Sequence, residues 1–341
     1  MNKKILVTGG AGYIGSHTVV ELVQAGYKPV IVDNFSNTKP WMVQRLIELV
    51  NTDLRVYEGD CVDVDFLKSV FDKEKEIHGV IHFAALKAVG ESVAEPLLYY
   101  RNNVCGMISV LETMRMFEVK NLIFSSSATV YGVPDKCPIT EDQPRKSPSS
   151  PYGATKVMCE DIIKDSTRGG CIKAVSLRYF NPIGAHDSGN IGELPVGVPN
   201  NLLPYITQAV AKKIPPLKIF GTDYNTKDGS CVRDFIHVVD LAKAHVSTLD
   251  YLIKSKENYD IFNVGTGKGT SVLELIDIFE KVNNVVIPRE VTARREGDIR
   301  ECYADAQKIK SKIGWESCKS IEQALEDAWR WQAKLTEIGK S

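Results

Sequence analysis

Residues near the middle of the chain have the types and spacing that moving a proton from an alcohol requires. Tyr152 and Lys156 stand one helical turn apart in "SPYGATKVMCED", so both project from one face of a predicted helix. An isolated tyrosine has a pKa of about 10 and is a poor base at pH 7. Lowering that pKa by about three units takes about 4 kcal/mol, which two cations close to the phenol in a dry cleft can supply. The pair is also compatible with an ordinary, partly exposed helix, and the spacing alone leaves both interpretations open.

A serine run supplies a third candidate, Ser127. It stands in "FSSSATVYG", directly after a predicted strand. Ligands of parallel sheets bind outside the carboxyl ends of the strands, so Ser125, Ser126, Ser127 and Thr129 are expected at that edge. A hydroxyl at position 127 can bridge the tyrosine and a substrate oxygen and pass a proton between them. A serine run is otherwise typical of a turn, but its place after the strand favours a site.

A glycine-rich loop near the N-terminus predicts a dinucleotide site. Gly9, Gly12 and Gly15 stand in "VTGGAGYIGSH", between a predicted strand and a predicted helix. Such glycines let backbone N–H groups approach a pyrophosphate, and the helix N-terminus adds its positive end. Asp33 ends the next strand, where a carboxylate can bind the adenosine ribose and repel a 2′-phosphate, so we expect NAD rather than NADP. Its nicotinamide ring would be the second cation beside the tyrosine. The alternative is a tight turn with a helix N-cap.

Two further strand ends carry side chains suited to the same cofactor. Asp60, beside Cys61, follows the third strand and could accept a hydrogen bond from the adenine amino group, although a lone aspartate there is more typical of a helix N-cap. After the fourth strand, "HFAALKAVGES" offers a small apolar wall and, in Lys87, a cation for ribose hydroxyls. A lone lysine is otherwise a solvated surface side chain. The wall consists of Phe83, Ala84 and Ala85.

The elements that must position these residues alternate between strand-like and helix-like segments. Runs rich in Val and Ile predict strands buried on both faces at 4–9, 29–33, 54–59, 79–84, 121–127, 172–180 and 259–265. Amphipathic segments predict helices, among them 97–117, 152–168 and 240–253. This alternation indicates an α/β fold: a Rossmann-type doubly wound parallel sheet with a smaller C-terminal substrate-binding α/β lobe. We expect residues 1–180, with 232–264 returning to them, to form the NAD-binding domain, and 181–341 mainly the substrate domain.

Composition argues against several classes of protein. Of 341 residues, 43% are hydrophobic and 25% charged, and the net charge is −1, so no global field favours a nucleic acid or an anionic membrane as partner. The N-terminal apolar run is too short for a signal peptide, and no stretch reaches the roughly 18 apolar residues of a membrane span. Eight scattered cysteines without a C-x-x-C pair predict free thiols, no metal site and a cytoplasmic protein.

Further motifs carry a resemblance to a known family. Besides the motifs quoted above, the chain contains "RYFNPIGAH", "PNNLLPYI", "GSCVRDFIHVVDLAKAH", "NVGTGKGTSV" and "RREGDIREC", in order and spread over roughly residues 4–303. Together they resemble the extended short-chain dehydrogenases/reductases, and within them the branch that epimerises UDP-hexoses at C4. The glycine loop and "YGATK" carry only the superfamily, whereas "RYFNPIGAH", "PNNL" and "RREGD" are far more specific.

The resemblance implies a role for each matching residue. Tyr152 would be the catalytic base, Lys156 would bind the nicotinamide ribose and depress its pKa, and Ser127 would assist. The implied cofactor-binding residues are Gly9, Gly12, Tyr13, Ile14, Gly15, Asp33, Asn34, Asp60, Cys61, Phe83, Ala84, Ala85, Lys87, Asn102, Ser125, Tyr152, Lys156 and Tyr179. The implied substrate-binding residues are Lys87, Ser127, Ala128, Thr129, Tyr179, Phe180, Asn181, Asn200, Asn201, Leu202, Lys218, Ile219, Phe220, Arg233, Arg295, Asp298 and Cys302.

The residues expected at the nucleotide end agree with elementary electrostatics. Arg233 and Arg295 could clamp two phosphates through forked, charge-assisted hydrogen bonds. Arg233 beside Asp234 could instead form a plain surface ion pair. Two positions depart from a common family pattern, because Phe235 and Cys302 stand where a tyrosine is frequent. The small Cys302 would leave room at the C2 substituent of the sugar, so we hypothesise that N-acetylated UDP-hexosamines also react; a buried thiol without a selective role is the alternative.

The predicted activity is NAD-dependent interconversion of UDP-glucose and UDP-galactose through a 4-keto sugar, with the cofactor retained between turnovers. A 4,6-dehydratase would need an acid pair at the site edge, where Ala128 and Thr129 stand. A UDP-glucuronate-directed enzyme would need extra cations, and an NAD-sensing regulator would not keep Tyr152 and Lys156. The helices at 97–117 and 152–168 resemble those of a dimer interface in this superfamily, so we expect a homodimer, although a sheet would require the same apolar faces.

Overall fold

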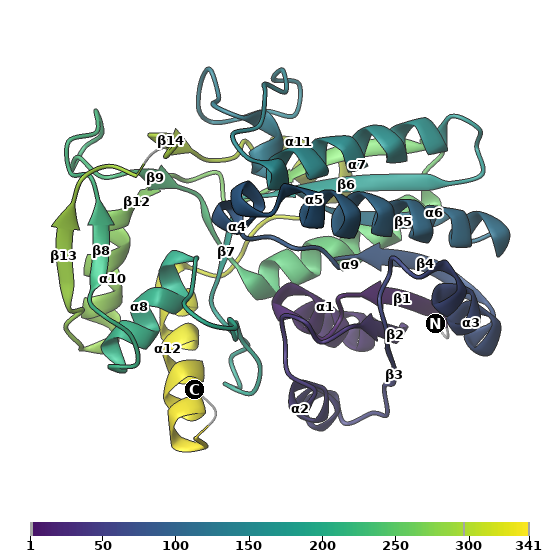
Figure 1. The fold of residues 1–341 in the computed structure, drawn as a ribbon, viewed down its shortest axis with the longest axis horizontal. Helices are drawn as coiled ribbons and strands as arrows, with labels where there is room; N and C mark the ends of the chain where they lie inside the picture. Colours follow the sequence, from purple (N-terminus) through teal and green to yellow (C-terminus); the bar gives the residue numbers. More distant parts are fainter. Residues whose placement is uncertain (1–2, 296, 340–341) are drawn as a thin grey trace.

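Among the residues that the structure describes, seven strands form a parallel sheet, which is the centre of the larger of two lobes (Figure 1). The computed structural model describes residues 3–295 and 297–339. The strand order is β11-β6-β5-β4-β1-β2-β3, so the direction of winding reverses between β1 and β4. Sheets of this kind bind their ligands outside the carboxyl ends of the strands at such a reversal. The strands are β1 (Lys4–Thr8), β2 (Lys28–Asp33), β3 (Arg55–Glu58), β4 (Ile77–His82), β5 (Asn121–Ser127), β6 (Lys173–Tyr179) and β11 (Tyr259–Val264).

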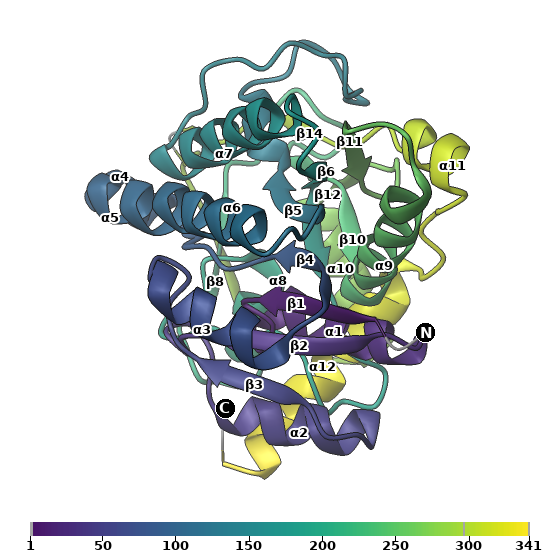
Figure 2. The same cartoon turned by 90° about the vertical axis from the view of Figure 1, so that its right-hand side faces the viewer.

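Helices cover both faces of this sheet, as Figure 2 shows. The helices on one face are α1 (Tyr13–Gln24), α2 (Trp41–Val50) and α9 (Val238–Lys254), and those on the other are α3 (Val64–Glu74), α6 (Gly106–Met116) and α7 (Pro151–Thr167). Strands enclosed in this way must be apolar on both faces, and Ile5, Leu6 and Val7 of β1 are fully buried. The predicted Rossmann-type sheet is confirmed, and each predicted strand lies close to its expected bounds.

The predicted helix over 97–117 is wrong in detail. A π-helical turn, η1 (Tyr100–Cys105), separates α5 (Pro96–Tyr99) from α6, and α4 (Val89–Ala94) precedes them. This turn contains Asn103, whose buried amide donates to the carbonyl of Leu86 (3.0 Å) and to the hydroxyl of Thr155 (3.0 Å). A wider turn changes the helical period by a fraction of a residue, which the apolar pattern of a short segment does not resolve.

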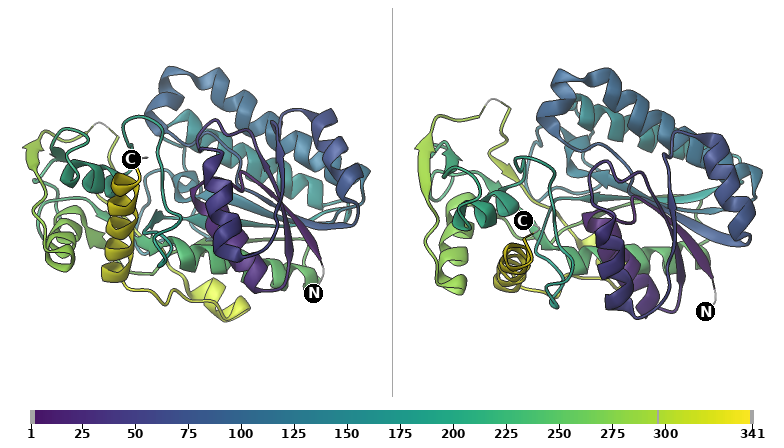
Figure 3. Two further views of the ribbon diagram at one scale, coloured as in Figure 1. Left: turned by 90° about the horizontal axis from the view of Figure 1, so that it is seen from below. Right: turned by 60° about the horizontal axis from the view of Figure 1, so that its bottom comes forward.

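A smaller lobe lies beside the sheet domain (Figures 1 and 3). Its apolar core is built by side chains of α8, β8, α10 and α12, which pack against β7 and β10. The elements are β7 (Asn181–Ile183), α8 (Leu202–Val210), β8 (Leu217–Phe220), β9 (Val232–Arg233), β10 (Phe235–His237), β12 (Thr270–Ser271), α10 (Val272–Asn283), β13 (Arg289–Thr292), β14 (Glu301–Cys302) and α12 (Ile321–Glu337).

The chain returns to the sheet domain between β10 and β12. α9 packs beside α1, β11 pairs with β6, and α11 (Gln307–Ile313) lies against β11. β9 and β10 themselves belong to the small sheets of the second lobe. The division into domains at residue 180 stays a prediction. Within residues 3–295 and 297–339 no helix combines the length and the apolarity that crossing a bilayer takes.

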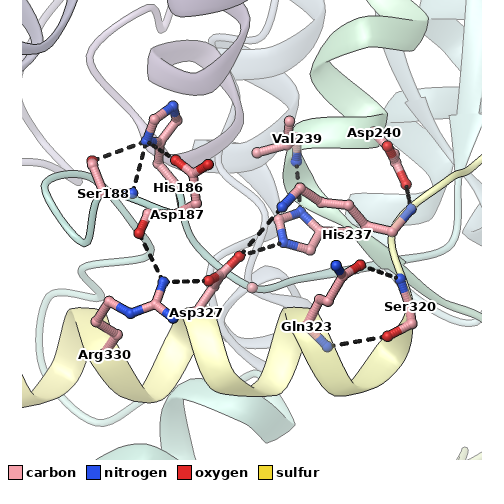
Figure 4. Close-up of polar contacts among 12 residues, drawn as sticks. His186, Asp187, Ser188, His237, Val239, Asp240, Ser320, Gln323, Asp327 and Arg330 are labelled. Atoms are coloured by element: carbon pink, nitrogen blue, oxygen red, sulfur yellow. Dashed lines mark hydrogen bonds and ion pairs between the residues drawn. The ribbon is translucent and has the colours of Figure 1, made fainter.

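A buried polar network joins β10 to α12 at the base of the smaller lobe (Figure 4). The Nε2 of His237 donates to the carboxylate of Asp327 (3.1 Å), and its Nδ1 accepts from the backbone N–H of Val239 (3.1 Å). Arg330 donates to the same carboxylate (2.6 Å) and to the carbonyl of Asp187 (2.7 Å). Asp327 thereby ties α12 to β10, and Arg330 ties α12 to the loop after β7.

Candidate active site

The glycine loop between β1 and α1 has the tight geometry that a pyrophosphate cradle needs. Gly9 has φ +68°, and a Cβ there would lie 2.8 Å from the backbone nitrogen of Ala84. A Cβ on Gly15 would lie 2.2 Å from the carbonyl oxygen of Gly9. Gly12 is the N-cap of α1, and a Cβ there would meet only that same oxygen, at 3.2 Å, within 4 Å. Side chains at Gly9 and Gly15 would thus push the strand, loop and helix apart.

The two residues that follow Gly12 hold the loop in place. The hydroxyl of Tyr13 donates to the carbonyl of Gly184 in the loop after β7 (2.7 Å), which ties the start of α1 to the smaller lobe. Ile14 packs against the apolar core on the α1 face of the sheet. The side chains of Tyr13 and Ile14 therefore hold the glycine loop in position.

The carboxyl ends of β2 and β3 bring together the side chains expected around adenosine. The Asp33 carboxylate accepts from the backbone N–H groups of Ala11 (3.0 Å) and Phe35 (2.9 Å). Burial nevertheless raises its pKa above the ordinary value, because desolvation outweighs those bonds. Asn34 donates to Asp60 across the gap between the strands (3.1 Å).

The helix N-cap alternative for Asp60 is wrong. Asp63 caps α3 and accepts from the backbone N–H of Phe66 (3.0 Å), whereas Asp60 accepts from Val62 (2.9 Å) in the preceding turn. The Asp60 carboxylate therefore remains close to Asn34 at the strand ends. The neighbouring Cys61 is buried, which raises the pKa of its thiol to about 12.

The segment after β4 lies against the glycine loop. Phe83 donates its backbone N–H to the carbonyl of Thr8 (3.0 Å), and the centroid of its ring lies 4.7 Å from that of His245, with the two planes tilted by 50°. Ala84 and Ala85 follow, both half-buried. The ammonium of Lys87 lies 3.1 Å from a carboxylate oxygen of Glu193 in the smaller lobe.

Tyr152 and Lys156 lie on one face of α7, and that face points to the end of β5. The Lys156 ammonium lies 5.8 Å from the centroid of the Tyr152 ring and donates to the carbonyl of Ser125 (2.8 Å). The Ser127 hydroxyl lies beside the phenol and lowers its pKa. Ser150 caps the helix just before Pro151, so the tyrosine is held at a rigid first turn. Tyr152 and Lys156 on α7 are therefore close to Ser127 at the end of β5.

Burial opposes the charged forms of both catalytic candidates. It raises the pKa of Tyr152 above the ordinary value, although the hydrogen bond with Ser127 lowers it in part. It also lowers the pKa of Lys156 to about 8, against the opposing influence of Cys159 and Glu160. The ammonium alone therefore does not turn the phenol into a base at neutral pH, and a second cation is needed.

The remaining predicted residues near this strand edge differ in their burial and in their hydrogen-bond partners. Thr129 has a buried hydroxyl that finds no hydrogen-bond partner among the described residues, while Ala128 beside it is half-buried; both lie in a 3₁₀ turn, η2 (Ala128–Tyr131). Tyr179 directs its hydroxyl to His245 (3.1 Å), and Phe180 packs in a small apolar cluster with Val130 and Tyr131. The side chain of Asn181 is exposed, and Asn102 donates to Asn103 (2.9 Å).

The expected nucleotide end lies on the smaller lobe. The guanidinium of Arg295 stacks on Phe220, 4.3 Å from the ring centroid. Arg233 lies 3.9 Å from the carboxylate of Asp298. Cys302 pairs with Arg233 between strands β14 and β9, and burial raises the pKa of its thiol to about 12. Two arginines, an aromatic ring and a carboxylate are thus gathered from segments far apart in the sequence.

The surface ion pair considered for Arg233 and Asp234 is wrong. Asp234 is fully buried and accepts from the backbone N–H groups of Thr266 (2.8 Å), Gly267 (3.1 Å) and Ala304 (3.1 Å). Asp234 therefore holds the loops around Thr266 and Ala304 in place, and it does not pair with the guanidinium of Arg233.

Two of the predicted substrate residues, Ile219 and Leu202, have side chains in the core of the smaller lobe, and two others, Lys218 and Asn200, have exposed side chains. Lys218 lies 3.8 Å from Glu290 of β13, and the side chain of Ile219 is in the lobe core. Leu202, the first residue of α8, packs against that core as well, and Asn200 is exposed. A role in binding at Ile219 and Leu202 would have to use the backbone.

Two residues were missed by sequence reasoning. The Glu193 carboxylate receives the Lys87 ammonium and the amide of Asn201 (2.8 Å), and Trp331 donates to its backbone carbonyl (2.9 Å). Asn103 joins the β4 loop to α7, as described above. Glu193 lies in a Gly- and Pro-rich loop without periodicity, which gave no signal, whereas the pair Asn102–Asn103 inside an apolar helix could have drawn attention to both amides.

The residues at this crevice fit NAD. The glycine cradle excludes Cβ atoms at Gly9 and Gly15, Asp33 and Asp60 stand at the strand ends where ribose and adenine groups would bind, and Tyr152 and Lys156 lie at the opposite end of the same edge. The unpaired hydroxyl of Thr129 beside Ser127 is a group that a bound ligand would satisfy.

Comparisons with known proteins agree with this geometry. A family model described as GDP-mannose 4,6 dehydratase matches residues 6–328. The UDP-glucose 4-epimerase of Bacillus subtilis (strain 168) is 52% identical over 338 residues, which are 99% of this chain and 99% of that protein. The crystal structure of UDP-glucose 4-epimerase from Bifidobacterium longum in complex with NAD+ and UDP is 44% identical, with TM-score 0.93 over 97% of this chain and 98% of that one. That of the Stenotrophomonas maltophila enzyme, with bound NAD and formylated UDP-arabinopyranose, is 43% identical, with TM-score 0.96 over 99% of this chain and 100% of that one. The chain therefore belongs to the UDP-glucose 4-epimerase family of extended short-chain dehydrogenases/reductases.

Proposed function

We propose that the protein interconverts UDP-glucose and UDP-galactose by inverting C4 of the hexose, with NAD held between turnovers. The observation that carries this proposal is the assembly of Tyr152, Lys156 and Ser127 at the end of β5, on the same sheet edge as the glycine cradle. The smaller lobe carries the arginines and the aromatic ring that we expect to bind the nucleotide, Arg233, Arg295 and Phe220. The reaction needs both: a firm hold on UDP and a proton acceptor at the sugar.

The chain's own residues account for the proton movements. NAD, when bound, supplies the reversible hydride acceptor that oxidation at C4 requires. Tyr152 as phenolate takes the proton of the 4-hydroxyl, Ser127 bridges the two oxygens, and Lys156 favours the anion. Arg233 and Arg295 would hold the diphosphate while Phe220 packs near the uracil, so the 4-keto sugar remains free to turn and receive hydride on its other face.

A 4,6-dehydratase, the activity in the description of the matching family model, is less well supported. That reaction removes water and needs a carboxylic acid and base beside Ser127. Ala128 and Thr129 occupy that turn, and neither carries a carboxylate.

The direct test is an assay of UDP-galactose with purified protein and no added NAD, in which the UDP-glucose formed is oxidised by a coupling dehydrogenase. We expect turnover, and cofactor absorbance in the purified protein. Tyr152→Phe should bind UDP with unchanged affinity by calorimetry and lose at least about two orders of magnitude in kcat, the scale of general-base catalysis. Full activity of Tyr152→Phe would refute the assigned mechanism, and an inactive wild-type protein would refute the function.

N-acetylated UDP-hexosamines are proposed as further substrates. Cys302 on β14 pairs with Arg233 on β9. A tyrosine at position 302 would fill more space than the small cysteine side chain.

We also propose that two copies associate through the helices on the α7 side of the sheet. α4, α5, α6 and α7 lie side by side (Figure 2), and their outer faces carry apolar side chains, of which Leu97 is 81% exposed. The others are Val89, Val93, Leu98, Ile108 and Met158. An apolar face of this kind favours burial against a second copy. Light scattering should give twice the chain mass, and a single-chain mass would overturn the dimer.

A cytoplasmic location is proposed from the thiols. All eight cysteines lie in the described part of the chain as free thiols, three of them exposed. Exposed thiols persist in a reducing compartment.

A further inference from the structure

One buried carboxylate, Glu160, ties the catalytic helix to two strands. Its side chain is 1% exposed and lies one helical turn after Lys156 on the sheet-facing side of α7. It accepts from the hydroxyl of Ser126 on β5 (2.6 Å) and from the Nε (2.9 Å) and Nη2 (2.6 Å) of Arg178 on β6. At the outer end, Arg145 lies 3.6 Å away.

These contacts adjoin the catalytic groups on both strands. Ser126 stands between Ser125, whose carbonyl accepts from the Lys156 ammonium, and Ser127, whose hydroxyl lowers the pKa of Tyr152. Ser126 and Arg178 face each other in the register of β5 and β6, so both side chains rise toward α7. A shift of α7 along the sheet would break the three bonds to Glu160 together with the bond from Lys156 to Ser125.

The energetics argue for alignment rather than for stability. Two ions taken from water lose several kcal/mol each in solvation, and a buried pair regains this only with very good geometry. Here Arg178 binds the carboxylate through two parallel bonds, which fixes direction as well as distance. Such a pair contributes little to the net free energy of unfolding. It does disfavour any other position of α7 along the sheet, because a shift would leave buried charges unpaired.

We propose that Glu160 is a positioning residue, which through Ser126 and Arg178 sets the register of α7 so that Tyr152 and Lys156 meet the end of β5. This inference rests on the proposed epimerase function. It adds to that function a residue which touches neither the substrate nor the cofactor.

The charge of Glu160 also acts on the Lys156 ammonium. The titratable groups around that ammonium are Tyr152, Cys159 and Glu160 on α7 and His82 on β4, while Arg178 on β6 faces Glu160. Burial lowers the pKa of Lys156 to about 8, and Cys159 and Glu160 oppose this lowering. Without the carboxylate the ammonium loses its proton at lower pH, and the field that favours the phenolate is lost with it.

The test is Glu160→Gln, which keeps the shape and removes the charge. We expect kcat for UDP-galactose to fall at least about tenfold, KM to change less than about threefold, and the alkaline limb of the kcat–pH profile to move to lower pH. Glu160→Asp, which keeps the charge, should restore the position of that limb. Asp327→Asn is the matched control, because it neutralises a buried carboxylate of the same kind at the distant β10–α12 contact; it should lower the melting temperature without moving the pH profile.

The outcomes separate the inference from the function on which it depends. A Glu160→Gln enzyme with a lower melting temperature but wild-type kcat and pH profile would overturn the positioning role while the epimerase stands. If this variant does not fold, Ser126→Ala, which deletes one bond on β5, decides: a fall in kcat at unchanged KM supports the role, and unchanged kcat refutes it. An inactive wild-type protein would remove the function itself.

Discussion

At the scale of single residues, burial decides the protonation state of the groups that would do the chemistry. Tyr152 and Lys156 are close enough to interact, yet desolvation raises the pKa of the phenol and lowers that of the amine, so each is pushed toward its neutral form. A phenolate at neutral pH therefore depends on a further positive charge, which fits a site that works only with an oxidised nicotinamide. The same rule keeps the Cys302 thiol protonated, so the proposed effect of this residue on the sugar would come from its size.

Replacing Cys302 by tyrosine tests its size as a gate. Cys302→Tyr should abolish turnover of UDP-N-acetylglucosamine and spare that of UDP-galactose, because the larger ring would occupy the space at the C2 substituent. The measurement is kcat/KM for both sugars on the same preparation, with Cys302→Ser as a control of similar volume. Equal loss or equal retention of both activities would contradict the gate.

At the scale of elements, the close contact between strand β1 and helix α1 is what makes the cofactor crevice possible. The loop brings Gly15 so near to Gly9 that a single methyl group would lie 2.2 Å from a backbone oxygen and 2.8 Å from Gly10 Cα. Backbone atoms cannot move aside as flexible side chains do, so the whole helix would have to shift. A shift of α1 would also strain the bond between Tyr13 and Gly184, which reaches into the second lobe.

Gly15→Ala should therefore give a folded protein that loses its cofactor. Overpacking of this kind costs about 1–3 kcal/mol of unfolding free energy. We expect absent NAD absorbance after purification, a lower melting temperature, and partial rescue of activity by added NAD. Gly169→Ala is the matched control, because an added Cβ there meets nothing within 4 Å. Retained cofactor in Gly15→Ala would show that the helix can yield without cost.

At the scale of the whole molecule, the two lobes are held together by polar contacts that surround the crevice. Glu193 links Lys87 of the sheet domain to Asn201 of the smaller lobe, and Tyr13 reaches Gly184. Within the smaller lobe, the network of Figure 4 fixes α12 to β10 through Asp327. The placement of the smaller lobe against the sheet domain therefore depends on the contacts of Glu193 and Tyr13.

The contribution of Asp327 should depend on pH. Burial raises its pKa, but the bond from His237 and the charges of Lys319 and Arg330 outweigh burial and hold the pKa below the ordinary value. A depressed carboxyl pKa gives stability that is present above the unfolded value, about 4, and is lost as pH falls through the folded value. Asp327→Asn should lower the free energy of unfolding by about 1–3 kcal/mol at pH 7, and the difference should shrink below about pH 4. Denaturant titrations at both pH values measure it, and an equal difference at both would contradict the assignment.

The sequence by itself determined the strands of the sheet, the glycine loop and the common face of Tyr152 and Lys156. Each of these follows from local spacing: period and apolarity for a strand, a fixed offset for two residues on a helix. The tertiary structure alone decided that Asp63 rather than Asp60 caps α3, that a π turn interrupts 97–117, and that Glu193, Asn103 and Glu160 join segments far apart in the chain. Those contacts, and the pKa values that burial sets, depend on which distant groups exclude water from one another. No local pattern in the sequence carries that information, because desolvation and long-range hydrogen bonding arise only once the lobes have packed.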